Sequence, residues 1–297
     1  MNKLTRTAIA ILAGGALLCG VRTLAQDAPP TLDPAKRQQQ QQQPPQQQQP
    51  DASKPADVTP LTLDSAPPPV NAEEEAAIKL FRDASMNDIA KKDQSGEDFL
   101  QKYPQSRYRS EVYLWLVRGY LAQGQVDKME DVGEKELALN PNDPQTLAIL
   151  GSTLPRAMNS STPNPQQRLD KSEAYCKKAL DLLPTLRKPP ELTDENFMKA
   201  KDQTSAMAYG GLGIIAFRRQ HFAEAVPNFE QAVKLDPTPD PVNYFLLGLS
   251  YEKTSHFDDA VAAFNKCAAV PGGLQEKCKT GVDEAKKLGA TQLSAPK

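Results

Sequence analysis

The side chains best suited to chemistry in this chain are its histidines and cysteines, of which there are 2 and 4. A neutral imidazole can bind a metal ion or move a proton, and a thiol can act as a nucleophile, a metal ligand or half of a disulfide. The histidines are His221 and His256, and Cys267 and Cys278 lie close together in the chain. The two histidines can share a metal ion, and the two cysteines can form a disulfide, only if the fold brings the members of each pair together.

The motifs of common enzyme classes are missing from the sequence. It has no Cys-x-x-Cys, no glycine-rich phosphate loop after a strand and no Gly-x-Ser-x-Gly. The run Gly210-Gly211-x-Gly213 lies inside an apolar helical pattern with no strand before it, which favours close helix packing. The sequence therefore predicts that the protein is not an enzyme and holds no cofactor.

The region from Ala206 to Gly273 carries one pattern twice at a shift of 35 residues. Self-similarity at such a period is the signature of a repeat array. Each copy reads as two helices joined by a polar turn, with apolar residues at steps of three and four. The first-copy residues are Tyr209, Leu212, Gly213, His221, Phe222, Ala225, Val226 and Phe229, and their second-copy equivalents are Tyr244, Leu247, Gly248, His256, Phe257, Ala260, Val261 and Phe264.

The two histidines therefore occupy one position in successive repeats. Stacked helices lie about 10 Å apart. Two imidazoles at that spacing cannot share one metal ion at about 2.0 to 2.1 Å each. His221 and His256 are predicted to be turn residues.

The pattern resembles the tetratricopeptide repeat. That family has an aromatic residue, Leu-Gly three residues later, then Ala, Phe and Ala in the second helix, and a closing Pro. The matching residues here are Tyr209, Leu212-Gly213, Ala225, Phe229, Ala232 and Pro237. The resemblance implies an all-α fold, a right-handed superhelical solenoid of antiparallel helix hairpins. The clearest repeats are residues 206–239 and 241–274, and degenerate repeats are expected at 71–104, 110–143 and 144–184.

Folded structure is predicted to span residues 71–290, starting near Asn71 as the cap of a first helix. Two polar stretches, Pro155–Arg168 and Thr185–Leu192, are predicted to be inserted loops, with Thr193 capping a long helix through Gln220. Trp115, the only Trp, is either a buried core residue or an exposed groove anchor.

The C-terminal region is predicted to form a capping helix from Leu274 to Leu288, followed by a tail at residues 291–297. Cys278, Val282, Ala285 and Leu288 are expected on its inward face. Because this helix should pack on the last repeat, Cys267 and Cys278 either form a disulfide or remain two separate buried thiols.

The N-terminal region is predicted to direct export. Residues 1–25 read as a signal peptide that is cleaved after Ala25, which places the mature protein in the periplasm or outside the cell. Lipidation at Cys19 and an uncleaved anchor are the alternatives. Residues 26–70 are rich in Gln and Pro and are predicted to be a disordered linker, which serves as a spacer or as a docking segment.

Charge and surface features favour a protein partner. The formal net charge is −2 and becomes −5 when the three basic residues of the signal peptide are removed, which argues against nucleic acid. The resemblance implies that first helices line a concave groove for a protein or peptide segment. By position, the groove residues would be Leu114, Arg118, Ala148, Gly210, Ile214, Phe217, Phe245 and Leu249.

The preferred function is a non-catalytic protein-interaction scaffold of the cell envelope or periplasm. The alternative is an envelope-assembly or cell-wall accessory component tethered by the Gln/Pro-rich spacer. A third function, an enzyme or a carbohydrate binder, would need polar groups converging from the two inserted loops. The sequence indicates no particular partner, no oligomeric state and no membrane span in the mature chain.

Overall fold

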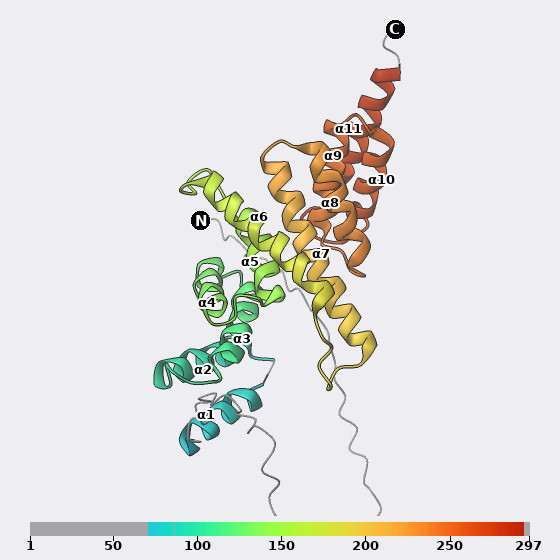
Figure 1. Cartoon of the computed structure of the whole chain (residues 1–297). Coiled ribbons are helices and arrows are strands. Elements are labelled where there is room, and N and C mark those ends of the chain that lie inside the picture. Colours follow the sequence, from blue (N-terminus) through green and yellow to red (C-terminus); the bar gives the residue numbers. More distant parts are fainter. Residues whose placement is uncertain (1–70, 86, 294–297) are drawn as a thin grey trace, which may run out of the picture. The chain divides into compact units, whose positions relative to one another are not determined.

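A computed structural model describes residues 71–85 and 87–293 of the chain. The predicted signal peptide (1–25), the predicted linker (26–70) and part of the predicted tail lie outside the described residues. Within the described residues the regular elements are all helices (Figure 1). They are α1 (Ala72–Asp83), α2 (Ile89–Lys102), α3 (Arg109–Ala122), α4 (Val126–Leu139), α5 (Pro144–Ala157), α6 (Pro165–Leu182), the 3-10 turn η2 (Leu183–Thr185), α7 (Asp194–Arg218), α8 (Phe222–Leu235), α9 (Pro241–Lys253), α10 (Phe257–Ala268) and α11 (Gln275–Leu293).

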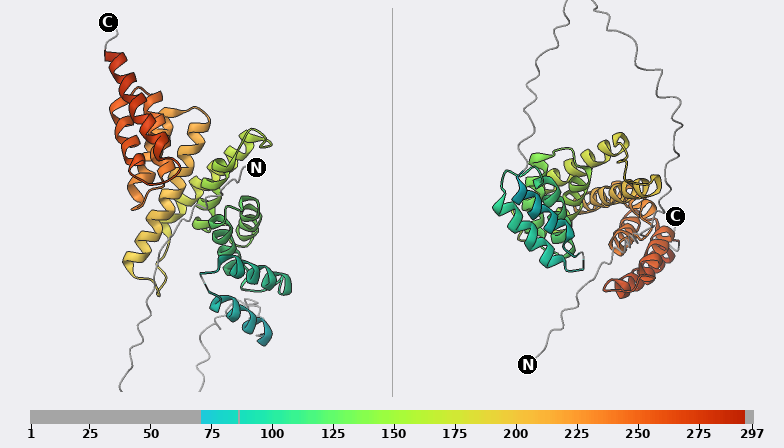
Figure 2. Two further views of the ribbon diagram at one scale, coloured as in Figure 1. Left: turned by 180° about the vertical axis from the view of Figure 1, so that it is seen from behind. Right: turned by 90° about the horizontal axis from the view of Figure 1, so that it is seen from below.

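The helices form five hairpins, each with an odd-numbered first helix and an even-numbered second helix. The first helices are α1, α3, α5, α7 and α9. Each second helix from α2 to α8 packs against its own partner and against the first helix of the next hairpin, and α10 packs against α9 and α11. Figures 1 and 2 show successive hairpins side by side. The predicted all-α solenoid of antiparallel hairpins with a capping helix is confirmed.

Side-chain caps fix where several helices begin. Asn71 Oδ1 accepts a hydrogen bond of 3.0 Å from the backbone N–H of Glu73, at the start of α1. Thr193 Oγ1 accepts one of 3.2 Å from Asn196 at the start of α7. Such caps satisfy N–H groups that have no partner inside the helix. Both helix starts agree with the prediction from sequence, although α7 ends at Arg218 rather than Gln220.

The repeated glycines let helices of one hairpin approach closely. A Cβ on Gly213 would lie 2.7 Å from the Phe229 ring, and one on Gly248 would lie 2.6 Å from the Phe264 ring. Both phenylalanines are fully buried. Any larger side chain at either glycine would push the two helices apart, which is why Leu-Gly recurs in the repeats.

The first predicted loop is shorter than expected. Helix α5 continues through Pro155 to Ala157, and α6 starts at Pro165, so the connection is residues 158–164 rather than 155–168. Pro155 lies in the last turn of α5, where it has no N–H for the helical hydrogen bond to the carbonyl of Gly151. Pro165 suits a first helical position because its ring presets the backbone angle. The polar residues at both ends of the predicted loop are helical, so polar composition did not indicate a loop there. The second predicted loop is present from Leu186 to Thr193, after η2.

The capping helix α11 is longer than predicted and reaches Leu293, so the predicted tail begins later. Cys278, Val282 and Ala285 are buried as expected. Leu288 is 46% exposed, so the prediction that it faces inward is wrong. The structure joins Cys267 of α10 to Cys278 by a disulfide, with Cα atoms 5.8 Å apart, which connects the cap to the last hairpin.

Candidate partner-binding surfaces

The two histidines lie at equivalent turns of the last two hairpins. His221 precedes α8 and His256 precedes α10, and neither side chain makes a capping hydrogen bond. Each follows a residue in the left-handed region, Gln220 at φ 62° and Ser255 at φ 63°. The prediction that both are turn residues is confirmed. Across the described part of the chain, no three His, Cys, Asp or Glu side chains are grouped to hold a metal ion.

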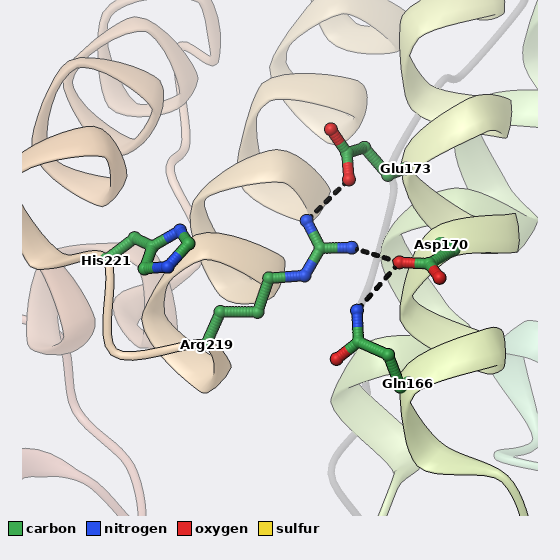
Figure 3. Close-up of a pocket in the computed structure, with 5 residues that line it drawn as sticks. All are labelled: Gln166, Asp170, Glu173, Arg219 and His221. Carbon is green, nitrogen blue, oxygen red and sulfur yellow. Dashed lines mark hydrogen bonds and ion pairs between the residues drawn. The ribbon is translucent and has the colours of Figure 1, made fainter.

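A polar pocket lies where α6 meets the turn between α7 and α8 (Figure 3). Arg219 donates to Glu173 at 2.5 Å and to Asp170 at 2.6 Å, and Gln166 donates to the same Asp170 carboxylate at 2.8 Å. His221 lines the opposite side. Because Arg219 pairs with both carboxylates, and Lys177 pairs with Glu173 as well, this cluster joins α6 to the following hairpin. Sequence reasoning did not find this cluster, whose only signal is the Arg218-Arg219 pair at a turn.

The predicted groove residues differ in exposure. Three are buried: Ala148, Gly210 and Ile214. Four are partly buried, and one is exposed. The partly buried residues are Leu114, Phe217, Phe245 and Leu249, and the exposed residue is Arg118. The first helices therefore do not present these eight residues as one continuous open surface.

The phenylalanines of this set pack within the array. The Phe217 ring lies 5.3 Å from Phe222 at an edge-on angle, and the Phe245 ring lies 5.9 Å from Phe264. Leu249 packs against the same cluster as Phe245. Such aromatic pairs stabilise a fold beyond the area they bury. These positions hold hairpins together.

The N-terminal part of the set is more open. Leu114 and Arg118 lie one turn apart on α3, and Leu114 belongs to none of the buried clusters formed by the described residues. Arg118 stays exposed and donates to Gln145 of α5. Surrounding protein displaces water from the guanidinium and lowers the pKa of Arg118, an effect opposed by nearby Asp143. An accessible cation with protein around it and a partly open apolar neighbour is suited to holding a partner side chain.

An ion pair joins the end of α5 to the start of α9. Arg156, near the end of α5, pairs with Asp240, which caps α9. Arg218 of α7 donates to the backbone carbonyl of Met158, just beyond α5, at 2.8 Å. Sequence analysis missed this arrangement. Its only signals were an arginine in the last turn of α5 and an Asp-Pro helix start, both of which are common.

Trp115 anchors a buried polar cluster. It packs at the edge of the first core cluster, and its Nε1 donates to Oδ1 of Asp93 at 3.0 Å. The ammonium of Lys92 lies 4.4 Å from the Trp115 ring centroid. Burial raises the pKa of Asp93 to about 6, against the lowering effect of hydrogen bonds from Gln123 and Trp115. Trp115 is therefore part of the fold of α2 and α3, which favours the core alternative over the groove anchor.

None of the helices between Asn71 and Leu293 combines the length and the apolar character needed to cross a membrane.

Tetratricopeptide repeat family models match residues 206–239, from the middle of α7 to just beyond α8, and residues 242–270, which contain nearly all of α9 and the whole of α10. Similar solved structures include a thermophilic tetratricopeptide repeat protein from Thermus thermophilus, with 18% identity and a TM-score of 0.45 over 72% of this chain and 96% of that one. PilW, described as a widely conserved type IV pilus biogenesis factor, has 16% identity and a TM-score of 0.46 over 76% and 96%. MamA has 24% identity and a TM-score of 0.39 over 63% and 92%. No curated protein matches the sequence.

Proposed function

We propose that this chain, a tetratricopeptide repeat protein, is a non-catalytic scaffold that binds a segment of a partner protein across α3 and α5. Its two matched repeats belong to a family of protein-interaction modules. Stacked hairpins offer such a partner an extended surface made by several first helices. The proposed binding surface covers only part of the predicted groove, because Ala148, Gly210 and Ile214 of that groove are buried.

The observation that carries the proposal is the pairing of Leu114 with Arg118. The two side chains follow each other by one turn on α3, so both reach the same side of that helix. Arg118 extends to Gln145 of α5 and hydrogen-bonds only a neutral amide there among its described contacts. The carboxylate of Asp143 is near enough to raise the pKa of Arg118 but makes no ion pair with it among the described contacts, so the guanidinium can still bind a carboxylate of a partner.

The chemistry of this surface defines the partner segment. A guanidinium favours a carboxylate, which it can bind through two parallel hydrogen bonds. The neighbouring Leu114 favours an apolar side chain. We expect the segment to carry an acidic residue about one helical turn, or one or two extended residues, from an apolar one.

Two variants test the binding position. Arg118→Ala and Leu114→Ala should each reduce capture of a partner isolated from envelope extract, and loss of a true anchor lowers affinity by about 30-fold or more. Lys178→Ala, on the exposed side of the second helix α6, is the matched control. Equal capture by all three variants and the wild type would reject α3 and α5 as the binding position.

The cell envelope as the place of action is part of the proposal. It is supported by the signal-like sequence of residues 1–25. Protein recovered from the envelope fraction should have an intact mass that begins at Gln26. A mass that retains Met1, or one that carries a lipid on Cys19, would contradict cleavage after Ala25.

The Gln/Pro-rich segment 26–70 supports the alternative of a tethered envelope-assembly component. Capture with a chain lacking residues 26–70 separates the two functions. Partners retained by the shortened chain favour binding on α3 and α5, whereas partners lost with the segment favour the tethered component.

A further inference from the structure

Two buried polar atoms at the junction between the second and third hairpins make no hydrogen bond with any described residue. They are Oε2 of Glu136, in the last turn of α4, and Oγ1 of Thr146, in the first turn of α5. Both residues are fully buried, at 0% exposed. The other carboxylate oxygen of Glu136, Oε1, accepts a hydrogen bond of 2.7 Å from Ser110 of α3.

Glu136 and Thr146 occupy a pair of positions that recurs along the array. One position lies in the last turn of a second helix, and the other lies in the helix that follows. The pairs are found from the distances to the closing Pro and to the Leu-Gly position, and the last pair from the shift of 35 residues. The equivalent pairs are Phe99–Val112, Ala179–Ala208, Ala232–Asn243 and Cys267–Cys278, and all of these residues are buried.

The contacts made at two of these junctions support the equivalence. Ser110 donates to Glu136 from 26 positions earlier in the chain. The Sγ atom of Cys267 lies 3.4 Å from the carbonyl oxygen of Pro241, which is also 26 positions earlier. Cys267 is bonded to Cys278, and their Cα atoms are 5.8 Å apart. Because the Glu136 junction is built in the same way, the two unpaired oxygens face each other between α4 and α5.

One water molecule can satisfy both oxygens. An ionised carboxylate only accepts hydrogen bonds, whereas a threonine hydroxyl can donate one. A water between them donates to Oε2 of Glu136 and accepts from the hydroxyl of Thr146. Buried waters in proteins typically take such places, where polar groups would otherwise remain unpaired at a cost in stability.

The carboxyl group of Glu136 lacks donors for its charge. Burial raises the pKa of Glu136, and the hydrogen bond from Ser110 opposes that effect. The nearby charge of Asp143 raises the pKa further, and the side chain of Asn140 lowers it. A donor at Oε2 stabilises the ionised form. The charge of this carboxylate and the hydroxyl opposite it therefore both favour a bound water.

We propose that Glu136 and Thr146 bind one buried water molecule, and that this water fixes Gln145 beside Arg118. Gln145 precedes Thr146 on α5, and its Oε1 accepts from Arg118 of α3. Ser110, which donates to Glu136, also belongs to α3. The contacts form a ring from α3 through α4 and the water to α5, and back to α3. Glu136 and Thr146 are thus positioning residues of the binding surface, a role that rests on the proposed function.

A crystal structure of the full chain that shows ordered water tests the site directly. We expect one water peak about 2.6 to 3.2 Å from Oε2 of Glu136 and from Oγ1 of Thr146. A direct hydrogen bond between the two side chains would overturn the inference. Two oxygens that remain unpaired would overturn it as well.

A pair of introduced cysteines tests whether the two positions face each other. In Glu136→Cys/Thr146→Cys the thiols take the places of the natural pair Cys267–Cys278, so they should form a disulfide in air. Glu136→Cys/Thr153→Cys is the control, because Thr153 lies two turns further along α5 and should not reach. Peptide mapping without reducing agent identifies the bond. Free thiols in both variants would reject the facing geometry.

A double-mutant cycle measures the coupling between the two side chains. Glu136→Ala and Thr146→Ala each remove one partner of the water and should each lower the Tm by about 2 °C or more. The double variant reproduces the residues of the Ala179–Ala208 junction, so it should lose less than the sum of the two single losses. Thr153→Ala is the control and should be additive with Glu136→Ala. Additive losses for Glu136 and Thr146 would overturn the shared water.

Capture separates the positioning role from the water site. Thr146→Val removes the hydroxyl at nearly constant volume and should weaken capture of a partner isolated from envelope extract, and Thr146→Ser should restore it. Normal capture by Thr146→Val, when capture still depends on Arg118, would reject the positioning role. Capture that does not depend on Arg118 would reject the proposed function. The water peak and the introduced disulfide test the site in either case.

Discussion

Asp93 accepts a hydrogen bond of 3.0 Å from Nε1 of Trp115, across the interface between α2 and α3. Asp93 is only 3% exposed, and its carboxylate also accepts from Gln123. Two donors stabilise the ionised form, but burial outweighs them and raises the pKa to about 6. A buried acid of this kind makes the stability of the first hairpins depend on pH.

The sign of that dependence follows from the raised pKa. The pKa of an unfolded Asp is about 3.9, so the folded protein binds this proton more tightly than the unfolded chain. The contribution of Asp93 is fully present below about pH 4 and is lost as pH rises through about 6. We expect Asp93→Asn to remove this slope and to raise the free energy of unfolding at pH 7 by up to about 3 kcal/mol.

Denaturant unfolding from pH 4 to pH 8 measures the effect. Asp98→Asn is the control, because Asp98 is an exposed acid on the same helix. Parallel pH profiles for the wild type and Asp93→Asn would show that Asp93 does not titrate in this range.

Gly119 leaves room for the Asp93 carboxylate. A Cβ at Gly119 would lie 2.1 Å from Oδ1 of Asp93. Although alanine is the better helix former, Gly119→Ala should lower stability by about 1 to 3 kcal/mol, because the carboxylate must leave its hydrogen bonds. Chemical denaturation should show that Gly119→Ala lowers the free energy of unfolding less in the Asp93→Ala background, which has no carboxylate to displace. Equal losses in both backgrounds would place the clash elsewhere.

The disulfide between Cys267 and Cys278 should stabilise the capping helix. Closing a loop of this size removes conformational freedom from the unfolded chain, at about 3 kcal/mol. The Cys267→Ala/Cys278→Ala variant should therefore unfold at lower temperature, and reducing agent should lower the wild-type transition without changing that of the variant. Peptide mapping under non-reducing conditions identifies the bond directly. If both thiols are alkylated in unfolded, unreduced protein, the bond is absent.

Phe245 and Leu114 should respond differently to truncation. Because Phe245 packs against Phe264 in a core cluster, Phe245→Ala should lose about 3 kcal/mol of stability, the lower part of the range for core phenylalanine. Leu114→Ala should change stability little and affect partner capture instead. Thermal unfolding together with capture by both variants decides this. If Phe245→Ala is as stable as the wild type but captures less partner, Phe245 is a binding residue and not a core residue.

The sequence by itself determined the local features of this protein. The 35-residue repeat, the Leu-Gly positions against Phe229 and Phe264, and the caps Asn71 and Thr193 could be recognised because each depends on residues within one hairpin or one turn. The candidate disulfide was also accessible, since only a short connection separates Cys267 from Cys278. The error at Pro155–Arg168 arose because polar composition does not distinguish an exposed helix from a loop.

Only the tertiary structure decided which repeated positions remain accessible. Equivalent positions in first helices should be equally exposed if every hairpin stacks alike, yet Gly210 and Ile214 are buried whereas Arg118 is exposed. The difference depends on how closely α9 approaches α7, because Asn243 lies against Gly210 and Leu247 shares a buried core cluster with Ile214. The burial of Asp93 likewise depends on α3 crossing α2 at Gly119. Such contacts depend on how whole helices pack together, and the local sequence pattern does not predict them.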